Sequence, residues 1–182
     1  MKNIRVIKTG IDVSKIVEQL EKYSNDWNHQ TKIKEAQSLL DRGYDELPAG
    51  VLQLVVGGVR RAEDFVGDSN ICIPTPAFYH HTAVLEFLTK NFHTFCRCGF
   101  LSIPVDGEVG FHIDEGKYYQ DKDRYHLSIL GRYEYFVGDE SVIVEPGTLM
   151  WFNNKLMHGT KNIGDCTRVT FVFDVPHNKN NP

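Results

Sequence analysis

The chain has 182 residues, of which 41% are hydrophobic and 24% charged, and this is the size and composition of one globular domain. Its 20 basic and 24 acidic residues give a formal net charge of −4, which argues against a dedicated nucleic-acid-binding protein. It contains no apolar run of about eighteen residues, so we expect no membrane span.

The start of the chain, Met1 to Arg5, leads into no long apolar segment, so we expect no signal peptide and a cytoplasmic location. The cysteines lack the CxxC spacing of zinc sites, and we expect free thiols in a reducing compartment. They are Cys72, Cys96, Cys98 and Cys166.

The pattern of the first 96 residues predicts a short strand at 3–8, followed mainly by helices. Apolar residues spaced three and four apart predict amphipathic helices at three places, 13–23, 33–41 and 83–95. Asp12 and Thr82 are the expected N-caps of the first and the third. Residues 24–34, around Trp27, are expected to form a loop, and 51–56 fit either a strand or a helix.

From residue 97 the pattern changes to short strand-like runs separated by turn signals such as Asp106-Gly107 and Pro146-Gly147. The predicted strands are 100–105, 109–113, 126–129, 133–137, 141–144, 149–152 and 167–175. This pattern predicts a mainly β fold with N-terminal helices, a double-stranded β-helix or jelly-roll barrel of the cupin type. We expect one domain over 1–182, with a helical and irregular first half at 1–96, a barrel core at 97–177 and a loose tail at 178–182.

The residues that carry chemistry are His112, Asp114 and His158. Residues two apart on a strand point to the same face, so His112 and Asp114 can converge on one point. Two histidines and one carboxylate hold Fe(II) on one face and leave the opposite positions open. We therefore predict that these three residues are metal ligands, against the alternative that His112 and Asp114 form an ion pair at a strand end.

Arg168 begins the last apolar run, where a charge is unfavourable without a partner. A buried guanidinium can pair bidentately with a carboxylate and stays charged. We predict that Arg168 binds the distal carboxylate of 2-oxoglutarate, whose other end would chelate the iron and leave one site for oxygen. A surface ion pair of Arg168 with Asp165 or Asp174 is the alternative.

Residues 98–177 resemble the aspartyl/asparaginyl β-hydroxylase family of Fe(II)- and 2-oxoglutarate-dependent dioxygenases. The resemblance covers a little under half of the chain. It rests on Phe100-Leu101-Ser102-Ile103, His112-Ile113-Asp114, Arg124-Tyr125-His126-Leu127, Gly147-Thr148-Leu149-Met150-Trp151-Phe152-Asn153-Asn154, His158, Asn162, Arg168 and Phe173-Asp174-Val175. Some members lack the acidic ligand, whereas this chain has Asp114, so a full triad is expected.

The resemblance implies that Arg124 and His126 line the cosubstrate site and that Ser102 touches 2-oxoglutarate. It implies a reaction in which 2-oxoglutarate and oxygen yield succinate and carbon dioxide while an unactivated C–H bond is hydroxylated. The implied substrate is an amino acid, either free or an Asp, Asn or Pro residue of a peptide or protein.

Two other functions are compatible with the same residues: a non-catalytic metal-binding jelly roll, and a cupin enzyme with a substrate that is not an amino acid. A cupin enzyme with another metal-dependent reaction, such as an isomerase, would not need a buried carboxylate clamp, so Arg168 and the R-x-H segment argue against that reaction. Tyr118 and Tyr119 follow the HxD segment in an expected loop, where they either contact substrate or are plain surface aromatics. His80, His81 and His93 lack a carboxylate at useful spacing and are expected to be structural.

Overall fold

The computed structural model describes residues 2–30, 50–62 and 66–177, and in this range the fold is mainly β. The predicted helix at 33–41 and tail at 178–182 lie outside the described residues. None of the described helices is long and apolar enough to cross a membrane.

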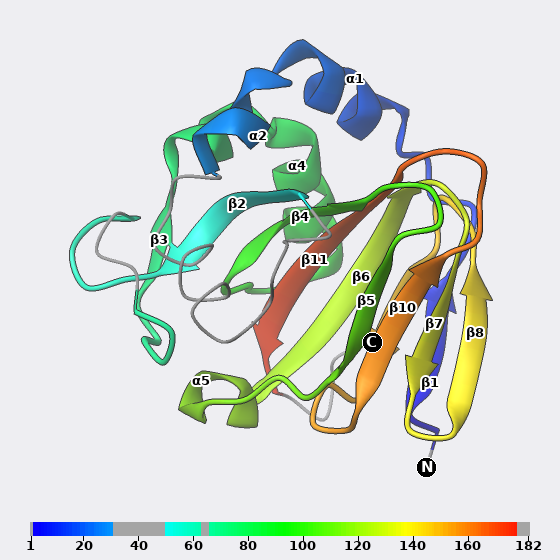
Figure 1. Cartoon of the computed structure of the whole chain (residues 1–182). Coiled ribbons are helices and arrows are strands. Elements are labelled where there is room, and N and C mark those ends of the chain that lie inside the picture. The colour runs from blue at the N-terminus through cyan, green and yellow to red at the C-terminus, as the bar shows by residue number, and fades with distance from the viewer. Residues whose placement is uncertain (1, 31–49, 63–65, 178–182) are drawn as a thin grey trace.

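Apart from the short helix α5, the helices lie in the first half of the chain, and most of the strands follow them (Figure 1). The helical elements are α1 (Ser14–Lys22), α2 (Asn25–Gln30), η2 (Pro76–Tyr79), α4 (Thr82–Asn91) and α5 (Lys117–Gln120). The strands are β1 (Ile4–Lys8), β2 (Gly50–Gly57), β3 (Cys72–Pro74), β4 (Cys98–Ile103), β5 (Glu108–His112), β6 (Lys122–Leu130), β7 (Tyr133–Val137), β8 (Glu140–Val144), β9 (Leu149–Phe152), β10 (His158–Asn162) and β11 (Arg168–Pro176).

Two antiparallel sheets face each other. The larger has the order β1-β9-β6-β11-β4-β2-β3 and the smaller the order β5-β10-β7-β8. The eight consecutive strands β4 to β11 are divided so that β4, β6, β9 and β11 lie in the large sheet and the other four in the small one. This double-sheet order is that of a jelly-roll barrel, so the predicted fold class is confirmed. Strands β1, β2 and β3 extend the large sheet at its two edges.

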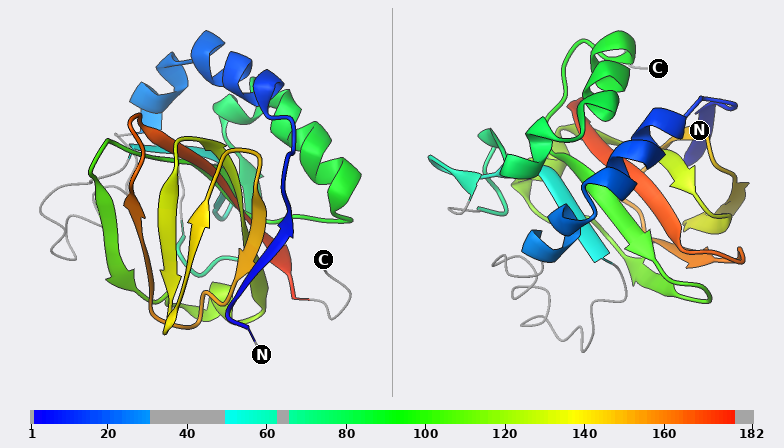
Figure 2. Two further views of the ribbon diagram at one scale, coloured as in Figure 1. Left: turned by 90° about the vertical axis from the view of Figure 1, so that its right-hand side faces the viewer. Right: turned by 90° about the horizontal axis from the view of Figure 1, so that it is seen from above.

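The large sheet has apolar packing on both faces. On its outer face, α1 and α4 lie side by side across the strands (Figure 2), and their apolar side chains join those of the sheet. Phe171 and Phe173 of β11 point to this helical side. Because side chains alternate along a strand, Arg168, Thr170 and Asp174 point the other way, into the barrel. A second apolar cluster includes Tyr133, Tyr135 and Phe152, and Arg168 contacts the ring of Tyr133.

The helix termini differ from the predictions. Asp12 accepts a hydrogen bond from the Ser14 amide (3.0 Å), although Val13 occupies the N-cap position. At the start of α4 the Thr82 side chain does not cap the helix. Instead, the Gln19 side-chain oxygen of α1 accepts from the Ala83 amide (2.9 Å), and the Gln19 amide nitrogen donates to the Thr82 hydroxyl (2.9 Å). A side chain from a distant helix therefore supplies the cap.

Several elements differ from the predictions, among them α5, which lies where a loop was expected. The loop expected at 24–34 contains the helix α2, and Trp27 in it packs near Phe100 of β4. Helix α4 ends at Asn91 instead of 95, because Phe92 has extended backbone and turns into the core. Strand β10 was missed because its sequence, His158-Gly-Thr-Lys-Asn162, lacks apolar residues. The segment 51–56 is a strand, β2.

Candidate metal centre

The two histidines of the predicted triad come from neighbouring strands of the small sheet. His112 ends β5, His158 begins β10, and the two residues are direct partners in the antiparallel ladder. Their ring centroids are 4.4 Å apart. The side chain of His158 is 3% exposed and that of His112 is 34% exposed, so the pair is closed on the barrel side and open at the rim.

Each imidazole is oriented by a backbone carbonyl two residues earlier. Nδ1 of His112 lies 2.9 Å from the Gly110 oxygen, and Nδ1 of His158 lies 2.9 Å from the Leu156 oxygen. A carbonyl only accepts, so both Nδ1 atoms carry the proton and both Nε2 lone pairs remain available. Burial lowers the pKa of His158, against the opposing effect of Asp114, and this favours the neutral imidazole that binds a metal.

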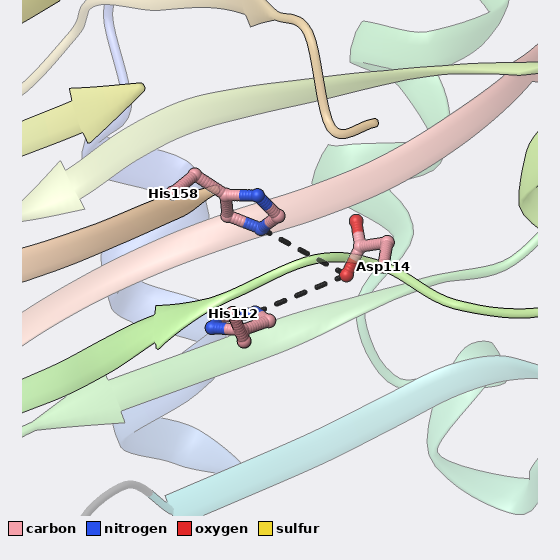
Figure 3. A group of neighbouring side chains, drawn as sticks. All are labelled: His112, Asp114 and His158. Carbon is pink, nitrogen blue, oxygen red and sulfur yellow. Dashed lines mark ion pairs between the residues drawn. The ribbon is translucent and has the colours of Figure 1, made fainter. Parts of the chain in front are cut away.

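Asp114 completes the triad with one of its two carboxylate oxygens. Oδ1 lies 3.9 Å from Nε2 of His112 and 3.8 Å from Nε2 of His158 (Figure 3). One ligand atom from each of the three residues lies within 4.8 Å of the other two, close enough for one ion to bind all three. A set of two imidazoles and one carboxylate suits a divalent transition metal and leaves positions open for other ligands. The predicted convergence of these residues is confirmed.

The second oxygen of Asp114 is held by the protein. Oδ2 accepts hydrogen bonds from Nη1 of Arg124 (3.0 Å) and from Nδ2 of Asn154 (3.1 Å). The Asp114 amide also donates to the backbone oxygen of Asn154 (3.3 Å). The carboxylate therefore has a defined orientation, with Oδ1 toward the histidines.

Arg124, expected at the cosubstrate site, is bound to two carboxylates. Besides Asp114 it contacts Asp174 of β11 through Nε to Oδ1 (2.7 Å) and Nη2 to Oδ2 (3.0 Å). The ring of Tyr119 lies 4.7 Å from its guanidinium carbon. The structure thus places Arg124 beside the metal triad, with its nitrogens engaged by side chains of the protein.

Arg168 lies deeper in the barrel and is 1% exposed. Its guanidinium carbon lies 3.9 Å from the centroid of the Tyr133 ring, while its Nε and Nη2 atoms have no hydrogen-bond partner in the part of the chain that the structure describes. Among the described residues Arg168 forms no ion pair, which rules out the surface pairing with Asp165 or Asp174 there. A buried guanidinium with free donors is costly unless an anion binds it.

Several neutral polar groups around Arg168 are also without partners. They are the hydroxyls of Ser128, Tyr133 and Thr170 and the Nδ1 atom of His126, all buried. Ser128 of β6 and Thr170 of β11 are direct partners across the ladder. Buried polar groups normally have partners, and the described residues supply none for this cluster. Sequence analysis missed Ser128, Thr170 and Tyr133. The sequence signal that could have identified two of them is strand alternation. Ser128 lies two residues after His126 on one strand, and Thr170 lies two residues after Arg168 on another, so each shares a face with a predicted site residue.

His126, also expected at the cosubstrate site, lies between the two groups. Its ring packs edge-on against Tyr135 (5.1 Å) and Phe152 (4.8 Å), and both of these rings also lie near His158. Burial, reinforced by the charges of Arg168 and Arg124, holds the pKa of His126 well below its usual value. The imidazole is therefore neutral at physiological pH.

Ser102 lies apart from this group. It is paired across the ladder with Val169, which packs on the helical side of the sheet, and its hydroxyl is 3.5 Å from the Gly50 oxygen. The next residue, Ile103, is the partner of Arg168 and faces the barrel. Because alternate residues face opposite ways, the structure does not bring Ser102 to the site.

Two further expectations are changed by the structure. Tyr118 lies in α5 and is fully buried, so it is not a surface aromatic of a loop. Its hydroxyl donates to Oδ2 of Asp174 (3.2 Å), and burial raises the pKa of this phenol, which keeps it a donor.

His80 and His81 do have a carboxylate partner: Asp26 of α2 lies 2.9 Å and 3.0 Å from them. This cluster joins α2 to the segment before α4.

No protein-family model and no curated protein matches the sequence. Solved structures that align with the chain include a predicted oxalate decarboxylase from Thermotoga maritima, with a TM-score of 0.39 and 13% identity over 50% of this chain and 73% of that one. A recombinant oxalate oxidase in complex with glycolate has a TM-score of 0.43 and 16% identity over 72% of this chain and 52% of that one. A cupin-2 conserved barrel domain protein from Salinispora arenicola has a TM-score of 0.36 and 12% identity over 43% and 60%.

These scores assign no activity to the chain, which spans about half the length of the oxalate oxidase. The strand order of the two sheets itself defines the cupin-type barrel. Inside that barrel, His112, Asp114 and His158 form a cluster that could hold a metal ion. Farther inside lie the buried guanidinium of Arg168 and several buried hydroxyls that have no hydrogen-bond partner among the described residues.

Proposed function

We propose that this protein is an Fe(II)- and 2-oxoglutarate-dependent dioxygenase that hydroxylates an unactivated C–H bond of an amino acid, free or as an Asp, Asn or Pro residue of a peptide. The observation that carries the proposal is the buried guanidinium of Arg168, which has two unpartnered nitrogens inside a barrel with a His-Asp-His cluster. The amino-acid substrate rests on the resemblance of residues 98–177.

Burial of an unpaired charge costs several kcal/mol, roughly, after relaxation of the protein. The ring of Tyr133 offsets only part of that cost, since a desolvated cation–π contact contributes about 2 kcal/mol. A carboxylate that accepts from Nε and Nη2 of Arg168 would satisfy both free donors in a bidentate pair. The hydroxyls of Ser128 and Thr170, which also lack partners, supply further donors for the same anion.

The ligand must also reach the metal cluster. Tyr133, which contacts Arg168, and Tyr135, which lies near His158, share one face of β7. These two rings therefore lead from Arg168 toward the metal cluster. A short dicarboxylate that carries a second metal-chelating end fits this arrangement, and 2-oxoglutarate has that chemistry. His112, Asp114 and His158 would hold the iron, which when bound supplies the activation of oxygen. The residues of the chain bind, orient and shield the reactants.

The buried aromatic wall serves the same chemistry. Tyr135, Phe152 and His158 are each at most 3% exposed. They exclude water from the inner side of the cluster, while the exposed edge of His112 leaves the rim as the entry for substrate. Exclusion of water strengthens the pairing of Arg168 with a carboxylate, because screening is weak in such a site.

The test is the formation of succinate from 2-oxoglutarate by the purified protein with Fe(II) and ascorbate. Reactions are run with and without a pool of free amino acids and with Asp, Asn and Pro peptides. We expect succinate to rise with one component and to disappear in His158→Ala and Asp114→Ala. The matched control is His93→Ala, an exposed histidine outside the cluster. Protein that binds iron and yields no succinate under any condition would refute the proposal in favour of a binding module or another cupin chemistry.

A further inference from the structure

Asp174 is a buried carboxylate that has no direct contact with His112, Asp114 or His158 and was not predicted to bind metal or cosubstrate. It lies on β11, is 1% exposed, and accepts from Nε and Nη2 of Arg124 and from the hydroxyl of Tyr118. Arg124 in turn donates to Oδ2 of Asp114. A line of contacts therefore runs from Tyr118 through Asp174 and Arg124 to the metal-binding carboxylate.

The guanidinium of Arg124 contacts the two carboxylates, those of Asp174 and Asp114, in different ways. Two of its nitrogens form a bidentate pair with Asp174, which fixes the plane and position of the guanidinium. The third nitrogen, Nη1, is then aimed at one oxygen of Asp114 only. With Oδ2 occupied by Arg124 and Asn154, only Oδ1 is presented to the two histidines.

We propose that Asp174 is a positioning residue which, through Arg124, sets Asp114 as a ligand that binds the metal through Oδ1 alone. This inference rests on the proposed metal site. It assigns Arg124 to the support of a metal ligand instead of to the cosubstrate, whose binding then depends on Arg168. Groups that hold metal ligands from behind orient them and adjust their basicity.

The surroundings of Asp174 make it a firm anchor. Its backbone amide donates to the Arg97 oxygen (2.9 Å), and its backbone oxygen accepts from the Cys96 amide (2.7 Å). The Tyr118 hydroxyl, which donates to Asp174, also accepts from the Arg97 amide (3.1 Å). Both the backbone and the side chain of Asp174 are thus held by the segment before β4 and by α5.

The experiment compares two variants with a matched control. Asp174→Asn keeps the shape of the side chain, removes its charge and places an amide against the donors of Arg124. Tyr118→Phe removes only the hydroxyl donor to Asp174 and leaves every charge in place. The control is Asp123→Asn, a buried carboxylate of β6 that bonds His177 and Trp151 instead of Arg124.

The first measurement is the affinity for Co(II) alone, whose visible absorption reports its ligand set. We expect Asp174→Asn to weaken Co(II) binding by about 10- to 100-fold, the usual effect of losing such a support, and to alter the absorption bands. Tyr118→Phe should show a smaller loss in the same direction, and Asp123→Asn should bind like the wild type. At saturating metal, the dependence of decarboxylation on 2-oxoglutarate should be unchanged in Asp174→Asn.

The outcomes separate this inference from the proposed function. Unchanged Co(II) affinity and spectrum in both variants would overturn the role of Asp174, as would a weakened response to 2-oxoglutarate with normal metal binding. Wild-type protein that binds Co(II) but produces no succinate would contradict the oxygenase alone, and the Co(II) comparison would still decide the role of Asp174. If the wild type bound no Co(II), both proposals would fall.

Discussion

Replacement of Arg168 by Met separates the effect of this residue on the free energy of unfolding from its effect on 2-oxoglutarate binding. The side chain is 1% exposed, and two of its nitrogens lack partners. Each buried unsatisfied donor costs about 1–3 kcal/mol, so their removal returns about 2–6 kcal/mol. Loss of the contact with Tyr133 costs about 2 kcal/mol, and the change of side-chain shape less than about 1.5 kcal/mol. We therefore expect the stability of Arg168→Met without ligand to lie between about 1.5 kcal/mol below and about 4 kcal/mol above that of the wild type.

Binding should change in the opposite direction. Removal of one partner from a buried charge pair costs about 2–5 kcal/mol, and 1.4 kcal/mol corresponds to a tenfold change. The concentration of 2-oxoglutarate needed for half-maximal succinate formation should therefore rise about 30- to 4,000-fold. Metal binding should be unaffected, because Arg168 lies outside the ligand cluster.

Two assays on the same preparations test this. Urea unfolding without ligand measures the free energy of unfolding. It is repeated with metal alone and with metal plus 2-oxoglutarate at 100 times the wild-type dissociation constant, and the difference between the two measures the effect of 2-oxoglutarate. That difference should be about 2.7 kcal/mol for the wild type and less than about 1 kcal/mol for the variant. A variant that is destabilised by several kcal/mol and still responds normally to 2-oxoglutarate would show that Arg168 is a structural residue. It would refute the argument from its unpaired nitrogens.

Three other predictions follow from the barrel interior. Thr170→Val should weaken 2-oxoglutarate binding by about 3- to 13-fold, which is the effect of one lost hydrogen bond of about 0.7–1.5 kcal/mol. The control, Ser102→Ala, lies on the opposite face of the sheet and should not change the binding. Equal effects of the two variants in a binding titration would contradict the placement of Thr170 inside the barrel and of Ser102 outside it. His126 has a lowered pKa, so below about pH 6.5 the unfolded chain binds a proton that the folded chain refuses, and stability falls as pH falls, by at most about 1.4 kcal/mol per pH unit. His126→Phe should remove that part of the slope in urea unfolding between pH 6.5 and 5, and an unchanged slope would show that His126 is not the group involved. Gly131 has a φ of +74°, and an added Cβ would lie 2.9 Å from the Cα atom of Arg168. Gly131→Ala should therefore lower the free energy of unfolding by at least about 1–2 kcal/mol. A variant with the stability of the wild type in thermal unfolding would contradict this.

Much of the fold could be predicted because the signals are local. Strand β7 and strand β9 have the predicted limits, since each is a short, largely apolar run next to a turn signal. Strand β10 has no such pattern, because Thr160 and Asn162 face the barrel as polar residues and use backbone partners. Its pairing between β5 and β7 is a tertiary contact and leaves no mark in its own sequence.

The sequence was enough to single out the important charged side chains, but it was harder to predict which residues they bond. His80 and His81 meet Asp26 across 54 and 55 positions, and Arg124 meets Asp174 across 50. The resemblance implied that Arg124 lines the cosubstrate site, whereas in the structure its nitrogens bond Asp114 and Asp174. The partner of a long, flexible guanidinium is decided by which carboxylate the folded sheets bring within reach.

By itself, the sequence determined which side chains share a face of a strand, because strand residues alternate with a period of two. That local geometry was enough to pair His112 with Asp114 and to single out Arg168 as a charge in an apolar strand. Only the tertiary structure decided which face of each strand borders the barrel. It placed Ser102 on the helical side and Ser128 and Thr170 inside, because a face becomes interior only when a second sheet, formed by strands distant in sequence, packs against it.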